Sequence, residues 1–169
     1  HHAFRVAKRV RTETGIANNA VSVSFAAVEL AKKIFGVLEG RNVLLIGAGE
    51  MSELAAKHLI SRRVGKIFIA NRTYARAVKM AEDFHGTAIE FDMLSERLHD
   101  VDIVITSTGA PGYVLTPPMI EAAIRRQKNR LLFLIDIAVP RDIDPAVGKI
   151  DNVYLYNIDD LQDIVDSNL

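Results

Sequence analysis

An apolar run that leads directly into a glycine turn limits what this chain can fold into more than any other feature. The run Val43–Ile46 is followed by Gly47-Ala48-Gly49, and Glu50–Ser61 then has the composition of a helix without internal glycine or proline. A strand, a tight turn and a helix N-terminus bring backbone N–H groups and the positive end of a helix dipole to one point, which favours a bound pyrophosphate. The residues expected to contact such a ligand here are Gly47, Ala48, Gly49, Glu50 and Met51.

The glycine pattern departs at one position from the fingerprint of dinucleotide-binding domains. The third glycine of that fingerprint, which allows a helix to pack closely on its strand, is replaced by Ser52. A serine is small enough to take nearly the same place. The alternative is a glycine turn that binds nothing, and the context between a strand and a helix favours the dinucleotide site.

From Asn42 onward, short apolar runs alternate with helical patterns. Strands are predicted at Val43–Ile46, Lys66–Ala70, Thr87–Glu90, Asp102–Thr106, Leu131–Ile135 and Val153–Tyr156. Helices are predicted at Glu50–Ser61, Tyr74–Phe84, Met93–Leu98 and Pro117–Gln127, with a longer helix at Val21–Val37 before the first strand. Apolar strands separated by helices indicate a parallel sheet covered on both faces, and right-handed crossovers favour the strand order 3-2-1-4-5-6. The predicted fold is a doubly wound, Rossmann-like α/β domain with an N-terminal helical linker.

The two ends of the chain give further predictions. Ala3–Arg11 has the pattern of a short basic amphipathic helix, whose charge indicates a solvated face rather than an RNA-binding patch, and Gly15–Asn19 is predicted to be a break. Ile158–Leu169 has apolar residues at helical spacing. This stripe fits either the start of a longer, truncated helix or a short helix packed back on the sheet.

Charge and composition exclude several classes of function. The 169 residues carry 21 basic and 21 acidic side chains, so no global field attracts nucleic acid or a membrane. No cysteine is present, which excludes disulfides, thiolate metal sites and a cysteine nucleophile within these residues. No apolar run reaches about 18 residues and no secretory signal is visible, so a cytoplasmic protein is expected. His1-His2 resemble the remnant of a purification tag.

The end of the second predicted strand indicates which dinucleotide binds. About 20 residues after the glycines, an NAD site normally holds a carboxylate for the ribose 2′-hydroxyl. This chain has Asn71-Arg72-Thr73 there instead. Arg72 offers a planar set of donors for a 2′-phosphate, and Asn71 and Thr73 can add neutral hydrogen bonds. NADPH is therefore expected rather than NADH. The alternative without a cofactor role is that Arg72 is a surface charge in a loop and that Thr73 only caps the next helix.

Two later loops also follow the carboxyl ends of strands, where ligands of such sheets bind. Small residues after the fourth strand leave room for a ribose and a nicotinamide, and the fifth strand runs into the segment Asp136–Pro145. The cofactor contacts expected from these loops are Ser107, Thr108, Gly109 and Ala138. Asp136 and Arg141 could pair to brace their loop. No base–nucleophile pair accompanies them and no histidine has a partner at metal-ligand spacing, so neither a catalytic residue nor a metal site is predicted.

Four segments resemble the glutamyl-tRNA reductase family, whose members begin tetrapyrrole (porphyrin) synthesis. The segments are Val6–Ile16, Asn19–Ala31, Gly47–Leu59 with Asn71-Arg72-Thr73, and Asp136–Pro145. The last one, DIAVPRDIDP, is the most discriminating, because generic dinucleotide-binding domains lack it. Together these segments extend the resemblance over essentially the whole chain after its first two residues.

The resemblance implies that this chain is part of an NADPH-dependent oxidoreductase with three domains. It implies the end of a truncated catalytic domain at residues 3–18, a linker helix at 19–40, the NADP-binding domain at 41–157 and the start of a truncated dimerisation (spinal) helix at 158–169. In that family, a cysteine of the catalytic domain attacks the glutamyl ester of the charged tRNA, and NADPH reduces the thioester to glutamate-1-semialdehyde. The resemblance therefore places glutamyl-tRNA binding and homodimer formation in the missing domains, and a contact with the next enzyme of the pathway is a further expectation. This cysteine-free chain is expected to bind NADPH and to be inactive alone.

Two other functions remain open from the sequence. A shikimate-dehydrogenase-like NADP oxidoreductase would share the glycine turn and the Asn-Arg-Thr segment, but it would need a substrate domain with a lysine–aspartate pair, and DIAVPRDIDP argues against it. A regulatory nucleotide-sensing module would bind nucleotides without hydride transfer and without a preference for the 2′-phosphate.

Overall fold

The computed structural model describes the backbone of residues 12–167 and the side chains of residues 19–167. The predicted helix Ala3–Arg11 and the residues His1-His2 lie outside this range. Within it, six strands form one sheet in the order β3-β2-β1-β4-β5-β6, and every neighbouring pair is parallel. The strands are β1 (Val43–Ile46), β2 (Ile67–Ala70), β3 (Thr87–Ile89), β4 (Ile103–Thr106), β5 (Leu132–Asp136) and β6 (Val153–Asn157). The predicted strand order 3-2-1-4-5-6 is confirmed.

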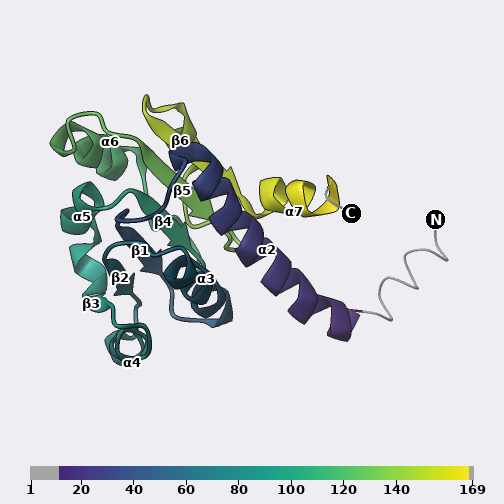
Figure 1. Ribbon diagram of the computed structural model, residues 1–169. Helices are drawn as coiled ribbons and strands as arrows, with labels where there is room; N and C mark the ends of the chain where they lie inside the picture. The colour runs from purple at the N-terminus through teal and green to yellow at the C-terminus, as the bar shows by residue number, and fades with distance from the viewer. Residues whose placement is uncertain (1–11, 168–169) are drawn as a thin grey trace.

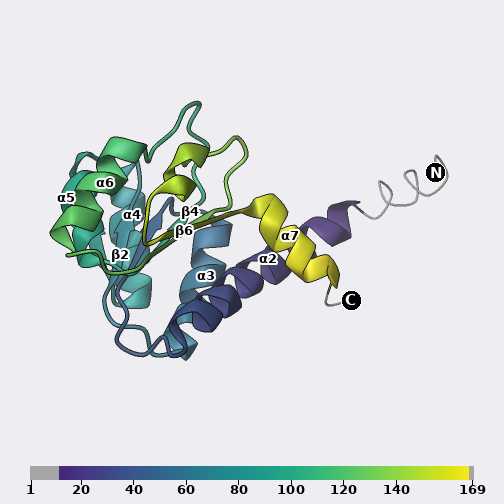
Figure 2. The ribbon, with the colours of Figure 1, turned by 90° about the horizontal axis from the view of Figure 1, so that it is seen from above.

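Helices cover both faces of this sheet (Figure 1). The α-helices are α2 (Thr12–Phe35), α3 (Glu50–Ser61), α4 (Tyr74–Phe84), α5 (Leu94–Arg97), α6 (Pro117–Arg126) and α7 (Ile158–Ser167). Three short 3-10 helices lie at η1 (Phe91–Met93), η2 (Leu98–Asp100) and η3 (Pro145–Lys149). Seen from above, α2 and α3 lie on one side of the sheet and α5 and α6 on the other, while α2 and α7 extend away from it together (Figure 2).

Alternate residues of each strand enter two separate hydrophobic cores, because successive side chains of a strand point to opposite faces. In β1, Val43 and Leu45 pack with α2, α3, α4 and α7, whereas Leu44 and Ile46 pack with α5 and α6. Every residue of β1, β2, β4 and β5 is buried. This explains why these strands, apart from Thr106 and Asp136 at their carboxyl ends, are continuously apolar rather than alternating, as a parallel sheet covered on both faces requires.

The N-terminal helix is longer than predicted. The sequence indicated a break at Gly15–Asn19 and a helix over Val21–Val37, but α2 runs without interruption from Thr12 to Phe35. The predicted break is wrong because a glycine inside a helix costs only about 1 kcal/mol relative to alanine. The helix ends where Gly36 takes a positive φ of 78° and its N–H bonds back to the carbonyl of Lys32 at 2.8 Å.

The C-terminal helix α7 begins directly after β6 and packs against α2. Its first turn is closed by a reciprocal pair of bonds, because the N–H of Asn157 donates to Asp160 Oδ2 at 2.9 Å and the N–H of Asp160 donates to Asn157 Oδ1 at 3.0 Å. Leu161 is fully buried, and the partly buried Ile164 and Val165 join the same core as α2. The stripe seen in the sequence is thus the face that α7 buries. No helix within residues 12–167 is long and apolar enough to cross a membrane.

Candidate functional site

A cleft of about 350 Å³ opens at the carboxyl edge of the sheet, where β1, β2 and β4 end. This is the point at which the strand order reverses direction, and doubly wound sheets bind their ligands there. The residues that line it are Gly47, Ala48, Gly49, Asn71, Arg72, Arg76, Ser107, Thr108, Gly109, Ala110 and Pro111. They come from three separate parts of the sequence, and only the parallel sheet brings them together.

The glycine turn forms the floor of this cleft, and its two glycines have different reasons to be glycine. Gly47 has a φ of +108°, and a Cβ there would lie 3.0 Å from the carbonyl oxygen of Ser107, so both conformation and space require glycine. Gly49 is the N-cap of α3 with an ordinary φ of −92°, and a Cβ there would meet no atom within 4 Å. The open space beside Gly49 lets a ligand approach the first N–H groups of α3, which favours an anionic group.

The serine at the third fingerprint position links the helix to the opposite wall. Ser52 is fully buried, and its hydroxyl lies 2.8 Å from the hydroxyl of Ser107 at the end of β4. A glycine would allow the same close packing but could not make this bond. The departure from the fingerprint therefore keeps α3 close to the sheet and adds a contact across the turn.

Two arginines lie at the β2 side of the cleft. Arg72 follows β2 by two residues, and its guanidinium lies 4.9 Å from the centre of the Phe91 ring, an arrangement that favours a cation–π contact. Arg76 lies in the first turn of α4. The cleft lining, all of it in the described part of the chain, includes no carboxylate. This end of the cleft therefore suits an anion such as a phosphate.

Two buried carboxylates are hydrogen-bonded to the end of β4 and to the loop that follows it. Asp136 is 1% exposed and Asp142 is 0% exposed. Asp142 Oδ2 accepts a 2.8 Å bond from the N–H of Thr108, and Asp142 Oδ1 accepts from the Thr108 hydroxyl. Burial raises the pKa of Asp142 above its ordinary value, the bonds from Thr108 oppose this rise in pKa, and the nearby charge of Asp136 adds to it.

The cleft gathers most, but not all, of the predicted contact residues. Eight of them line it: Gly47, Ala48, Gly49, Asn71, Arg72, Ser107, Thr108 and Gly109. Four do not belong to the lining: Glu50, Met51, Thr73 and Ala138. Thr73 is the N-cap residue of α4 but makes no side-chain capping bond, and Asn71 donates to its carbonyl at 2.9 Å. Ala138 is buried, and its N–H donates to Asp136 Oδ1 at 3.1 Å.

Arg76, Ala110 and Pro111 line the cleft without having been predicted. Arg76 had a usable signal, because it lies in the first turn of the helix predicted to begin at Tyr74, directly after the strand end that carries Arg72. Ala110 and Pro111 had no comparable signal, since their place depends on the path of a loop.

The proposed pairing of Asp136 with Arg141 is wrong. Asp136 accepts backbone N–H groups of its own loop, from Asp142 and Ile143 at 2.9 Å each. Arg141 instead pairs with Asp159 of α7 at 2.6 Å. The loop is braced as expected, but a carboxylate surrounded by amide donors needs no cation to satisfy it.

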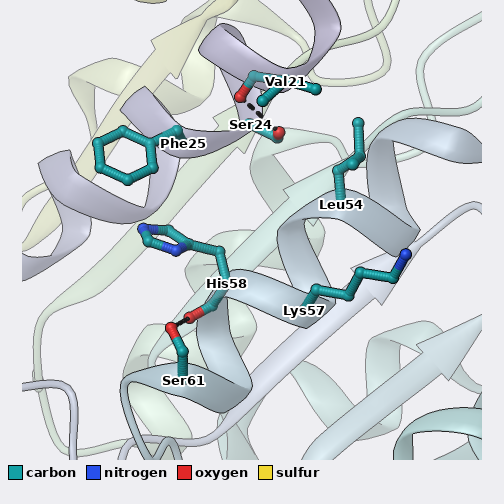
Figure 3. Close-up of a pocket in the computed structure, with 7 residues that line it drawn as sticks. All are labelled: Val21, Ser24, Phe25, Leu54, Lys57, His58 and Ser61. Carbon is teal, nitrogen blue, oxygen red and sulfur yellow. Dashed lines mark hydrogen bonds between the residues drawn. The ribbon is translucent and has the colours of Figure 1, made fainter.

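A second pocket, of about 270 Å³, is lined by residues of α2 and α3 and by none of the glycine turn. Figure 3 shows its lining side chains. His58 points toward Phe25 there, with the two ring centres 4.4 Å apart. Burial lowers the pKa of His58, the charge of Arg62 lowers this pKa further, and Glu29 opposes both. The lowered pKa favours the neutral form of this histidine. Among the described residues, no cluster of three or more His, Asp or Glu side chains could hold a metal ion.

Comparisons with known proteins agree with this geometry. A family model described as shikimate / quinate 5-dehydrogenase matches residues 29–164. The chain is 69% identical to a glutamyl-tRNA reductase of Syntrophus aciditrophicus over 168 residues, which is 99% of this chain and 40% of that protein. The structure is similar to that of glutamyl-tRNA reductase from Methanopyrus kandleri, with a TM-score of 0.82 and 42% identity, over 98% of this chain and 42% of that one.

A third comparison concerns a separate domain. The nucleotide-binding domain of a glutamyl-tRNA reductase from Thermoplasma volcanium matches with a TM-score of 0.65 over 88% of this chain and 92% of that one, and at 17% identity it shows the shared fold alone. The chain spans about two fifths of the length of the curated relatives it matches. It therefore belongs to the shikimate/quinate 5-dehydrogenase family of domains, and along its whole length it resembles the corresponding part of the glutamyl-tRNA reductases.

Proposed function

We propose that this chain is the NADPH-binding domain of a glutamyl-tRNA reductase, which reduces glutamyl-tRNA to glutamate-1-semialdehyde in porphyrin synthesis. The observation that carries the proposal is the cleft itself, which is lined by the glycine turn, including the N-cap of α3, together with Arg72 and Arg76. The amides of the turn would hold the pyrophosphate, and the arginines would hold the 2′-phosphate. The high identity to glutamyl-tRNA reductases supports the assignment of the substrate.

The residues of this chain indicate which steps of the reaction this domain would support in the complete enzyme and which would fall to other domains. The bound cofactor would supply the hydride, while this domain holds and orients it. The chain has no cysteine, so formation of the thioester would fall to the catalytic domain. We expect residues 3–18 and 158–169 to lead into the catalytic and dimerisation domains, which would bind glutamyl-tRNA and join two copies. We also expect the complete enzyme to act in the cytoplasm, and the chain alone to bind NADPH without turnover.

The alternatives predict different behaviour. A shikimate-dehydrogenase-like enzyme is favoured by the name of the matching family model, but the sequence identity of 56–69% over nearly the whole chain is to glutamyl-tRNA reductases. A nucleotide-sensing module would bind NADPH and NADH about equally. Comparing the two cofactors therefore separates the sensor from the proposed domain.

Arg72→Ala should weaken NADPH binding by about 1.5–3 kcal/mol, the range for hydrogen bonds to charged groups, and leave NADH binding nearly unchanged. The reason is that only NADPH carries the 2′-phosphate. Calorimetric titration of the purified chain with both cofactors measures this. Arg126→Ala, which removes the same charge from the exposed end of α6, is the matched control and should change neither affinity. Equal losses for NADPH and NADH in Arg72→Ala would contradict the role of Arg72.

A further inference from the structure

The loop after β5 lies beside the loop after β4 and is bonded to it by backbone groups. Leu115 and Ile143 form a short parallel bridge between the two loops. The carbonyl of Asp142 accepts bonds from the N–H groups of Val114 at 2.6 Å and Leu115 at 3.1 Å. These bonds hold the far end of the β4 loop, beyond the residues that line the cleft.

The side chain of Asp142 holds the near end of the same loop. Its two carboxylate oxygens accept the N–H and the hydroxyl of Thr108. The Thr108 hydroxyl in turn accepts a 3.2 Å bond from the N–H of Ala110. Thr108 and Ala110 both line the cleft, so a carboxylate that does not line the cleft is bonded to one of its walls.

The position of Asp142 is itself fixed by Asp136 at the end of β5. Asp136 Oδ2 accepts the N–H groups of Asp142 and Ile143, and Asp136 Oδ1 lies 3.3 Å from the hydroxyl of Thr106 on β4. Hydrogen bonds therefore run from the sheet through Asp136 and Asp142 to Thr108. Burying two neighbouring carboxylates is costly, and these bonds to backbone and hydroxyl donors offset that cost.

We propose that Asp142 is a positioning residue for the dinucleotide, because its carboxylate sets the conformation of the wall formed by Thr108, Gly109 and Ala110. This inference rests on the proposed function. It also assigns Thr108 a different role from the one that its place in the cleft suggests. The Thr108 hydroxyl donates its one hydrogen bond to Asp142, so Thr108 shapes the wall and does not donate a hydrogen bond to the cofactor.

Variants of Asp142 test this in the purified chain with NADPH as the probe. Asp142→Ala should weaken NADPH binding at least tenfold. Asp142→Asn should stay within threefold of the wild type, because its amide oxygen can accept from the Thr108 N–H and its amide nitrogen can donate to the Thr108 hydroxyl. Asp144→Ala is the matched control, because Asp144 caps η3 in the same loop and does not line the cleft. It should bind NADPH within twofold of the wild type.

Amide hydrogen exchange at Thr108 reports on the wall without any cofactor. The Thr108 N–H should be protected in the wild type and in Asp142→Asn, and should lose protection in Asp142→Ala. Unchanged NADPH affinity in a folded Asp142→Ala would overturn the proposal, as would unchanged protection. Absence of NADPH binding in the wild type would instead refute the proposed function, and the exchange measurement would still decide whether Asp142 holds Thr108.

A pair of substitutions at Thr108 covers the case in which Asp142→Ala does not fold. Thr108→Ser keeps the hydroxyl and should bind NADPH within twofold of the wild type. Thr108→Val keeps the shape and the N–H bond to Asp142 but removes the hydroxyl that bonds Asp142 and Ala110, and it should bind at least threefold more weakly. Equal affinities of these two variants would overturn the proposal.

Discussion

The carboxyl edge of the sheet and the side of the domain formed by α2, α3 and α7 differ in the kind of contact that predominates. At the edge, short polar contacts such as Ser52–Ser107 and Asp142–Thr108 determine the shape of the cleft. On the helical side, apolar side chains pack, and some remain outside the core, with Val21 52% and Phe25 49% exposed. Directional bonds fix individual atoms, whereas apolar packing depends on area and volume. The edge should therefore respond to changes of one atom, and the helical side to changes of volume.

The largest effect should come from Gly47→Ala at the edge. The alanine backbone would have to adopt a φ of +108°, and its methyl group would lie 3.0 Å from the Ser107 carbonyl oxygen. We expect a loss of about 3 kcal/mol in the free energy of unfolding, from backbone strain and overpacking together. Denaturant unfolding measures this. Gly49→Ala is the control, because its Cβ would meet no atom within 4 Å, and a loss as large as that of Gly47→Ala would contradict this account.

A somewhat smaller effect should follow from Leu161→Ala on the helical side. Leu161 is fully buried between α7 and the core, so removing its side chain leaves a cavity. We expect about 2 kcal/mol of lost stability, the low end of the range for such substitutions. NADPH affinity, measured by titration, should stay within twofold. If NADPH affinity fell together with the free energy of unfolding, the helical side and the carboxyl edge of the sheet would not be energetically independent.

The smallest effect should be the pH dependence due to His58. Burial lowers the pKa of His58 in the folded chain below its ordinary value of 6.5, so the unfolded chain binds more protons in that window. Stability should therefore be fully present above pH 6.5 and decline as the pH falls from 6.5 toward the lowered pKa of His58. Chemical unfolding at several pH values measures this decline.

Two variants sharpen the test of His58. His58→Phe keeps a ring beside Phe25 but cannot titrate, so the decline between the two pKa values should disappear. Replacing the exposed His85 by glutamine should leave the decline in place. If His58→Phe kept the full pH dependence, another group would have to be responsible.

The sequence was a good guide to the sheet and a weaker one to the loops. Strand positions and strand order followed from apolar runs and right-handed crossovers, because each strand is buried on both faces. The positions of the glycine turn and of Arg72 in the cleft could be predicted because both come directly after the ends of strands. The true partner of Asp136 could not be predicted, because it consists of backbone N–H groups whose direction depends on the loop conformation. The helical start at Thr12 was missed because a single glycine is a weak signal.

The Arg141–Asp159 ion pair has a consequence for how the two regions influence each other. Arg141 contacts α7, while the next residue, Asp142, holds the wall of the cleft. The contact to α7 and the contact to the cleft wall are thus made by adjacent residues of the chain. The carboxylate of Asp159 is 80% exposed, and an ion pair in water contributes only about 0–1 kcal/mol. Substitutions in one region combined with substitutions in the other should therefore be close to additive, and raising the ionic strength should bring them closer still.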